Sequence, residues 1–117
     1  MPFHDTCQAL LDRYVAFYRS GDAAGCASIY ADQAQIYSPY GPPALGRQAI
    51  ELLHRDWVED GGEDKEIKVL QSGLDGDLGW CLAAFSEADA DAGWSLNVLE
   101  RQPDGGWLIV QSSLTEA

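Results

Sequence analysis

Apolar residues recur at helical spacing in two segments of the first half of the chain. In residues 6–20 the apolar positions are Cys7, Leu10, Leu11, Tyr14, Phe17 and Tyr18. This spacing predicts a helix with one apolar face. Asp5 and Gln8 are expected to form a capping box at its start, and Gly21 is expected to end it. Ile50, Leu53, His54 and Trp57 share one face of a further helix over residues 47–59.

Shorter elements are expected between these two helices. Asp22 can cap a short helix that continues through Tyr30, and residues 33–38 have the composition of a strand. Residues 39–46 are expected to be a loop, because their proline and glycine residues are incompatible with a helix interior and with a central strand. These residues are Pro39, Gly41, Pro42 and Pro43.

The second half of the chain has the pattern of strands separated by turns. Four strands are predicted at residues 65–73, 78–87, 93–102 and 106–114, with turns at 75–77, 88–93 and 103–106. Short turns make neighbouring strands antiparallel, and helices followed by strands indicate an α+β fold. We expect a single domain over residues 1–117. The acidic stretch from Asp60 to Glu66 is interpreted as a solvated loop that leads into the first of these strands.

The strand at 93–102 can be oriented in two ways. Alternation places Trp94, Leu96 and Val98 on one face and Asn97 on the other, so burying the apolar face would leave Asn97 in solvent. The strand at 106–114 has the same ambiguity. A sheet with one apolar face and one mixed face also fits a homodimer that packs through the apolar face and has a half-polar pocket opposite.

Charge and composition exclude several classes of function. The chain has 7 Lys and Arg against 19 Asp and Glu, a net charge of −12, which disfavours binding to nucleic acid and to anionic membranes. No signal peptide and no run of eighteen apolar residues is present, so a cytoplasmic protein is expected. The three cysteines are interpreted as reduced and buried, and two histidines supply no ligand set, so neither a metal nor a cofactor is expected.

Several motifs together resemble the ketosteroid isomerases and the SnoaL-like polyketide cyclases of the nuclear transport factor 2-like superfamily. The matching segments are Arg13-Tyr14, Gly21-Asp22, residues 30–32, 38–43 and 46–50, and the closing segment 101–110. The resemblance covers nearly the whole chain. It implies a cone-shaped α+β fold in which three N-terminal helices pack into a strongly curved, mainly antiparallel sheet. It says less about function, because this fold supports isomerases, cyclases, hydrolases and non-catalytic dimerisation domains.

The resemblance also implies roles for individual residues. Tyr14 matches the tyrosine that donates a hydrogen bond to the substrate oxyanion, and Asn97 stands where the isomerases have a protonated aspartate as second donor. Ser38 stands where they have the aspartate that acts as general base. A serine has no ionisation near neutral pH, so ketosteroid isomerase activity is not expected. An oxyanion-binding pair of Tyr14 and Asn97 remains compatible with the chemistry of an amide and a phenol.

The remaining candidates surround the same expected cavity. Tyr30 and His54 match two tyrosines that extend the hydrogen-bond chain behind the oxyanion tyrosine, and His54 is expected to orient Tyr14. Gln111 and Ser113 match positions in the cavity wall. The large side chains of Tyr40, Trp57 and Trp80 are expected either to border the cavity or to fill it.

Two functions remain open on the sequence. The first is a domain that binds a small apolar or carbonyl-containing molecule without an assignable reaction. The alternative is an enzyme of isomerase or cyclase type, in which Tyr14 and Asn97 polarise a carbonyl group and His54 or water moves the proton. A metal- or cofactor-dependent enzyme is a third and weaker reading. The discriminating observation is whether Tyr14, Ser38, His54 and Asn97 meet at one cavity that solvent can reach.

Overall fold

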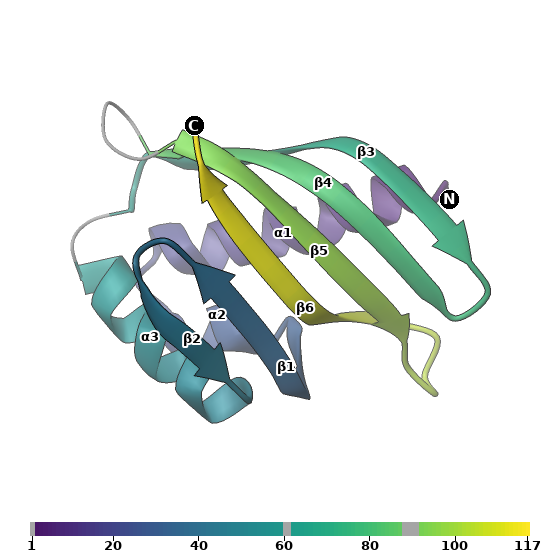
Figure 1. Ribbon diagram of the computed structural model, residues 1–117, viewed down its shortest axis with the longest axis horizontal. Helices are drawn as coiled ribbons and strands as arrows, with labels where there is room; N and C mark the ends of the chain where they lie inside the picture. Colours follow the sequence, from purple (N-terminus) through teal and green to yellow (C-terminus); the bar gives the residue numbers. More distant parts are fainter. Residues whose placement is uncertain (1, 60–61, 88–91) are drawn as a thin grey trace.

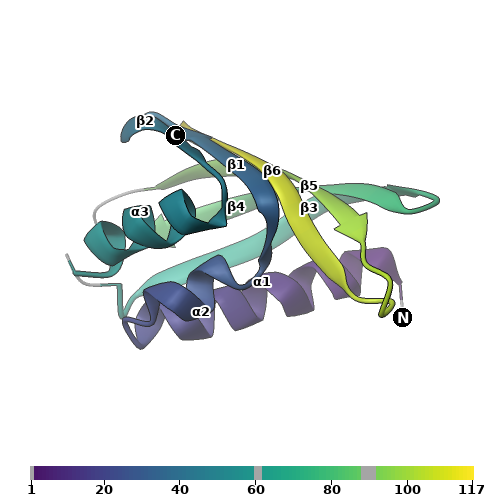
Figure 2. The same ribbon diagram turned by 90° about the horizontal axis from the view of Figure 1, so that it is seen from below.

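Three helices pack against one face of a curved sheet (Figure 1), and Figure 2 shows them on its concave side. The computed structural model describes residues 2–59, 62–87 and 92–117. The helices are α1 (Phe3–Arg19), α2 (Ala23–Ala27) and α3 (Arg47–Glu59). The strands are β1 (Tyr30–Ser38), β2 (Gly41–Leu45), β3 (Lys65–Asp75), β4 (Leu78–Glu87), β5 (Ala92–Arg101) and β6 (Trp107–Glu116). The order of elements confirms the predicted α+β fold.

The six strands form one mixed sheet with the order β2-β1-β6-β5-β4-β3. Neighbouring strands are antiparallel except β1 and β6, the second and third strands of the sheet, which run parallel. The parallel pair arises because β1 comes from the helical half of the chain and lies beside the last strand. The sheet is therefore mainly antiparallel, as predicted, and β3 to β6 begin and end within two residues of the predicted bounds. Most of the expected turn at 88–93 lies outside the described residues.

The segment that the sequence predicted as a loop contains a strand. Gly41–Leu45 forms β2 and pairs with β1 in a hairpin, in which Ile36 lies opposite Ala44. Pro42 and Pro43 are tolerated because β2 is an edge strand, where an amide that faces solvent is not needed for pairing. The prediction of a loop over residues 39–46 was wrong, because the prolines exclude a central strand but not an edge strand.

The start of α1 also differs from the prediction. The helix begins at Phe3 after Pro2, no side chain of the described residues caps it, and Asp5 lies within its first turn. Gln8 bonds instead to the edge strand β3, where its Nε2 donates to the Ile67 carbonyl at 3.1 Å and its Oε1 accepts from the Val69 amide at 2.8 Å. Gln8 thus joins α1 to the sheet edge and cannot close a capping box.

The short helix α2 matches its predicted start but not its predicted end. The Asp22 carboxylate accepts a hydrogen bond from the Gly25 amide at 2.8 Å, as expected for an N-cap. The helix ends at Ala27, and Tyr30 is already the first residue of β1. This early end places the Tyr30 side chain on the concave face of the sheet, where it is buried.

The orientation of β5 is settled by the helices. Asn97 is 2% exposed, whereas Trp94 and Leu96 are 44% and 47% exposed. The concave face lies under the helices, so the side chains that point toward it are buried whatever their polarity. Plain alternation of apolar and polar residues, which would have buried Trp94 and Leu96, gives the wrong face, and the orientation expected from the resemblance is confirmed.

Candidate ligand-binding site

A row of small and polar side chains crosses the concave face of the sheet beneath α1. Cys81, Asn97 and Ser112 lie opposite one another on β4, β5 and β6. The next row along the same face contains Ser95 and Leu114. Cys81, Ser95 and Ser112 leave space above the sheet because their side chains are shorter than the aliphatic residues of a filled core.

Asn97 lies in a closed set of hydrogen bonds. Its Oδ1 accepts a bond from the Ser112 hydroxyl at 2.8 Å, and its Nδ2 donates to the Ser95 hydroxyl at 3.1 Å. A longer contact of 3.8 Å joins Nδ2 to the Cys81 sulfur. The amide is buried and satisfied by its neighbours, so it has a fixed orientation before any ligand arrives.

Tyr14 and His54 form the second buried polar pair. The Tyr14 hydroxyl lies 2.7 Å from His54 Nε2, and His54 Nδ1 lies 2.8 Å from the Ile50 carbonyl oxygen. A carbonyl oxygen can only accept, so the proton of the neutral ring is on Nδ1 and Nε2 is an acceptor. Tyr14 therefore donates its single hydroxyl proton to His54. The predicted hydrogen bond between these two residues is confirmed.

Burial sets the ionisation of this pair. The pKa of His54 is lowered to about 4, chiefly because the ring is shut away from water, with a smaller lowering contribution from the charge of Lys65. The pKa of Tyr14 is raised well above its ordinary value, again chiefly by burial. Both groups are neutral at pH 7, and the lone pair on Nε2 of the neutral imidazole accepts the hydrogen bond from the Tyr14 hydroxyl.

The cavity has a narrow inner part and a wider mouth. The inner part measures about 30 Å³, and the residues that line it include Tyr14, Tyr30, Trp57, Asn97 and Ser112. The mouth measures about 270 Å³ and is lined by Tyr18, Tyr40, Trp57, Lys65, Phe85, Glu87 and Leu114. The two parts share Trp57, Lys65, Phe85 and Leu114, so they lie next to each other. Together they reach the lower end of the volumes usual for small-molecule pockets, roughly 300–1,000 Å³.

The predicted site residues fall into three groups in the structure. Tyr14, Tyr30, Trp57 and Asn97 line the inner cavity, and Tyr40 borders the mouth. His54 is 0% exposed and contacts the rings of Tyr14 and Trp57, so it supports the wall and does not line it. Ser38 lies at the β1–β2 turn, where its hydroxyl accepts a bond from the Tyr40 amide, and it lines neither part of the cavity.

Gln111 and Ser113 point away from the cavity. In the pairing of β5 with β6, Gln111 lies opposite Val98 and Ser113 opposite Leu96, both on the outer face. The register shifts between Val98–Gln111 and Leu99–Ile109, so Val110 is an extra residue in β6. This bulge reverses the alternation that runs from Ile109, and Ser112 and Leu114 face the cavity in place of the two predicted residues. Trp80 is on the same outer face, opposite Val98, and does not fill the cavity.

Sequence reasoning missed Lys65 and Glu87 at the mouth. Lys65 stands in the acidic stretch that was interpreted as solvated, yet it is only 8% exposed. Glu87 is its partner across the β3–β4 pair, and its Oε1 atom is buried without a hydrogen-bond partner in the described structure. Lys65 starts a predicted strand in which Ile67 and Val69 follow at alternate positions. This alternation could have predicted that the Lys65 side chain shares the inward face with them.

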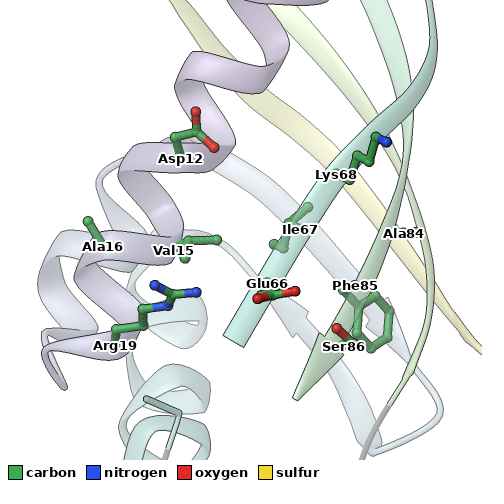
Figure 3. A pocket seen from close by; sticks show the side chains of 10 residues that line it. All are labelled: Asp12, Val15, Ala16, Arg19, Glu66, Ile67, Lys68, Ala84, Phe85 and Ser86. Atoms are coloured by element: carbon green, nitrogen blue, oxygen red, sulfur yellow. The ribbon is translucent and has the colours of Figure 1, made fainter. Parts of the chain in front are cut away.

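A larger hollow lies outside the cone and does not contain the predicted residues. It measures about 580 Å³ and lies between α1 and the strands β3 and β4. Figure 3 shows Asp12 and Arg19 of α1 opposite Glu66 and Lys68 of β3, with Val15 and Ile67 between the two elements. Charged side chains of both signs therefore border this hollow. One of them, Arg19, joins α1 to β3 by donating a hydrogen bond to the Lys65 carbonyl oxygen at 2.8 Å. The convergence of buried polar groups marks the inner cavity as the candidate site.

The described part of the chain has neither a metal-binding cluster nor a membrane-spanning helix. Residues 2–59, 62–87 and 92–117 contain no group of three or more His, Cys, Asp or Glu side chains placed to hold a metal ion. Over the same ranges no helix has the length and apolar character needed to cross a bilayer. The three cysteines are free and buried.

Solved structures of similar shape share the fold at low sequence identity. A ketosteroid isomerase-like protein from Erwinia carotovora atroseptica SCRI1043 matches with a TM-score of 0.79 and 17% identity, covering 93% of this chain and 92% of that chain. A domain of unknown function with a cystatin-like fold from Nostoc punctiforme PCC 73102 matches with a TM-score of 0.82 and 16% identity, covering 97% and 76%. ActVI-ORFA from Streptomyces coelicolor matches with a TM-score of 0.70 and 17% identity, covering 97% and 96%.

The family model for the SnoaL-like domain matches residues 7–115, from the first buried turn of α1 to the end of β6. This range includes every residue described above as lining the cavity. Together with the helix-lined concave sheet, the match extends the resemblance noted from the motifs to the whole domain. The chain belongs to the SnoaL-like domain family.

Proposed function

We propose that this domain binds a small, largely apolar molecule in the cavity between α1, α3 and the concave sheet face, without catalysing a reaction on it. One observation supports this proposal most directly: the buried polar groups are already paired with one another. Tyr14 donates to His54, and Asn97 is held by Ser95 and Ser112. Such groups orient a ligand through their remaining acceptor positions and shape the wall.

The pairing of Tyr14 disfavours the catalytic alternative. An oxyanion donor must direct a proton at the developing negative charge, and the only hydroxyl proton of Tyr14 is held by His54. The His54 tautomer cannot reverse this bond while Nδ1 donates to the Ile50 carbonyl. The oxygen of Tyr14 can still accept a bond from a ligand hydroxyl or amine. An isomerase or cyclase that used Tyr14 as its oxyanion donor would have to break the Tyr14–His54 bond in each turnover.

The two predicted residues that could take the place of a general base, His54 and Ser38, are both absent from the lining of the cavity, which also disfavours the alternative. A general base must come within hydrogen-bond reach of the proton that it removes. Ser38 is bonded at the hairpin turn and lines neither part of the cavity. An assay of proton transfer on a steroid with a carbonyl group beside an acidic carbon tests this directly. Turnover by the wild-type protein that is lost in Tyr14→Phe would favour the enzyme.

Binding is tested with the neutral fluorescent probe N-phenyl-1-naphthylamine. We expect its fluorescence to rise on addition of the protein, because the probe leaves water for an apolar pocket. Leu114 borders both parts of the cavity, so Leu114→Trp should fill the shared space and weaken binding at least about tenfold. Leu74→Trp is the matched control, because Leu74 is 51% exposed and borders no part of the cavity. Equal binding by wild type and Leu114→Trp would contradict the proposed site.

A homodimer is the second part of the proposal. The outer face of the sheet exposes Trp80, Trp94 and Leu96, which lie on neighbouring strands β4 and β5. An exposed apolar patch of this kind usually marks an interface, and a two-fold dimer would cover the same patch on both copies. The cavity opens on the opposite face, so association through the outer face would leave it accessible.

A further inference from the structure

Glu87 is a half-buried acidic side chain at the mouth of the cavity. On β4 the side chains of Cys81, Ala83 and Phe85 are buried under the helices. Glu87 follows them at the same two-residue spacing, so it points to the same face of the sheet. There it lines the mouth, which measures about 270 Å³. One of its two carboxylate oxygens, Oε1, is buried.

This buried oxygen lacks a donor within the described structure. Oε1 accepts no hydrogen bond, and none of the ion pairs among the described residues includes Glu87. Lys65 is its neighbour across the β3–β4 pair, but the Lys65 ammonium group lies over the rings of Tyr18 and Phe85, 4.6 and 4.8 Å from their centres. An unpaired buried acceptor costs free energy and is rare in folded proteins. The atom therefore indicates a place for a donor group.

The charge of Glu87 also acts inside the cavity. The pKa of Tyr14 is raised chiefly by burial, and the charge of Glu87 is one of the smaller contributions that raise it further. The field of the carboxylate thus reaches the cavity wall as well as the mouth. It favours the hydrogen end of a donor group that enters the mouth and opposes a negative group in the same place.

The mouth has room for the body of a ligand, whereas the inner part does not. The inner part measures about 30 Å³, which is space for water only. Much of the wall of the mouth is aromatic or aliphatic, with Trp57, Phe85 and Leu114 among its residues. Tyr40 packs edge-on against Trp57, with ring centres 6.2 Å apart, and so extends this wall. A molecule in the mouth would have apolar contacts for its body and one strong acceptor, Glu87.

We propose that the ligand is a small neutral alcohol or phenol that lies in the mouth and donates its hydroxyl hydrogen to Glu87. Its apolar body then packs against Trp57, Phe85 and Leu114. This rests on the proposed binding function and names its ligand class. A hydroxyl group supplies the donor that Oε1 lacks. An organic acid would bring a like charge to Glu87, and a protonated amine would bring a second ammonium group next to that of Lys65.

The test compares two competitors that differ by one donor. 1-Naphthalenemethanol and its methyl ether have the same aromatic body, but only the alcohol has a hydroxyl hydrogen. Each is titrated against protein-bound N-phenyl-1-naphthylamine, whose fluorescence falls as it is displaced. We expect the alcohol to bind at least about tenfold more tightly, because a hydrogen bond to a charged acceptor contributes about that factor. The ether is the more apolar molecule, so hydrophobic binding alone would favour the ether.

Variants locate the source of the preference. Glu87→Met keeps the approximate length of the side chain and removes both oxygens, so the preference for the alcohol should disappear while the ether still binds. Glu87→Gln keeps a neutral acceptor and should retain a smaller preference. Glu66→Met is the matched control, because Glu66 is exposed on the neighbouring strand β3 and is not among the described residues that line the mouth. Leu114→Trp should weaken both competitors.

The outcomes separate this inference from the proposed function. If N-phenyl-1-naphthylamine binds in the cavity and the alcohol has no advantage over the ether, the inference is wrong and the binding function stands. The same holds if neither competitor displaces the probe. If the probe itself does not bind, both proposals are wrong. The wild-type ratio decides the matter even if Glu87→Met does not fold. A preference that survives in a Glu87→Met variant shown by circular dichroism to be folded would also overturn the assignment to Glu87.

Discussion

Acid should destabilise this protein through His54 well before most carboxylates are protonated. The pKa of His54 is about 4 in the folded state, against an ordinary value of 6.5 that applies to the unfolded chain. Between these values the unfolded state binds a proton that the folded state does not. The free energy of unfolding therefore falls as pH falls through this window and is fully restored above it.

The size of the effect follows from the two pKa values. The His54 contribution lost between pH 7 and pH 5 is about 2 kcal/mol, and the loss by pH 4 is about 3 kcal/mol. The physical cause is the buried position of the ring, whose Nε2 accepts from Tyr14 and whose Nδ1 donates to the Ile50 carbonyl. Protonation would place a second donor against the tyrosine hydroxyl and charge a ring that is 0% exposed.

The measurement is a series of urea unfolding curves at several pH values for wild type and for His54→Gln. Glutamine can donate and accept but does not titrate, so every other group cancels in the difference between the two proteins. The difference in unfolding free energy should change by about 2 kcal/mol between pH 7 and pH 5, in the direction that favours wild type at pH 7. A constant difference would refute the reasoning. If His54→Gln does not fold, an imidazole NMR titration of wild type serves as the check, and a midpoint above pH 6 contradicts the prediction.

Four other outcomes are expected. Tyr14→Phe should lower the free energy of unfolding by about 1–3 kcal/mol in urea, because His54 Nε2 loses its donor, whereas Tyr37→Phe at a 45% exposed position should have little effect. Ser112→Ala should cost a similar amount, about 1–3 kcal/mol, by removing the donor to Asn97 Oδ1, and Ser113→Ala on the outer face is its control. Gly93→Ala should lower the melting temperature because the added Cβ would overlap the Thr115 carbonyl oxygen, while Gly41→Ala has open space around it. Light scattering at micromolar concentration should give twice the chain mass of 12.7 kDa, and Leu96→Glu should give the monomer; a wild-type monomer would contradict the dimer.

The sequence predicted the parts of this fold that depend on local pattern. The predicted apolar stripes of α1 and α3 contain the buried residues of both helices, while Phe17, Leu53 and Trp57 of the same stripes are half-buried, and α3 has the predicted bounds. Helices followed by strands indicated the α+β class, and the resemblance implied that His54 orients Tyr14. These inferences succeeded because an apolar helix face must be buried and a buried hydroxyl must be hydrogen-bonded in any fold.

Only the tertiary structure decided which side of each strand faces the cavity. Alternation divides β5 into two faces but does not say which one the helices cover, and the helices cover the face with Asn97. Strand side chains alternate with a period of two, so the one extra residue at Val110 reverses the faces of the residues after it. Ser112 therefore faces the cavity, and Gln111 and Ser113 face outward. Lys65 became a pocket residue through its pairing with β4 and its contact with two rings from distant segments. The candidate site is formed by residues of α1, α3 and several strands that are far apart in the sequence. It therefore depends on long-range contacts that no single segment of the sequence determines.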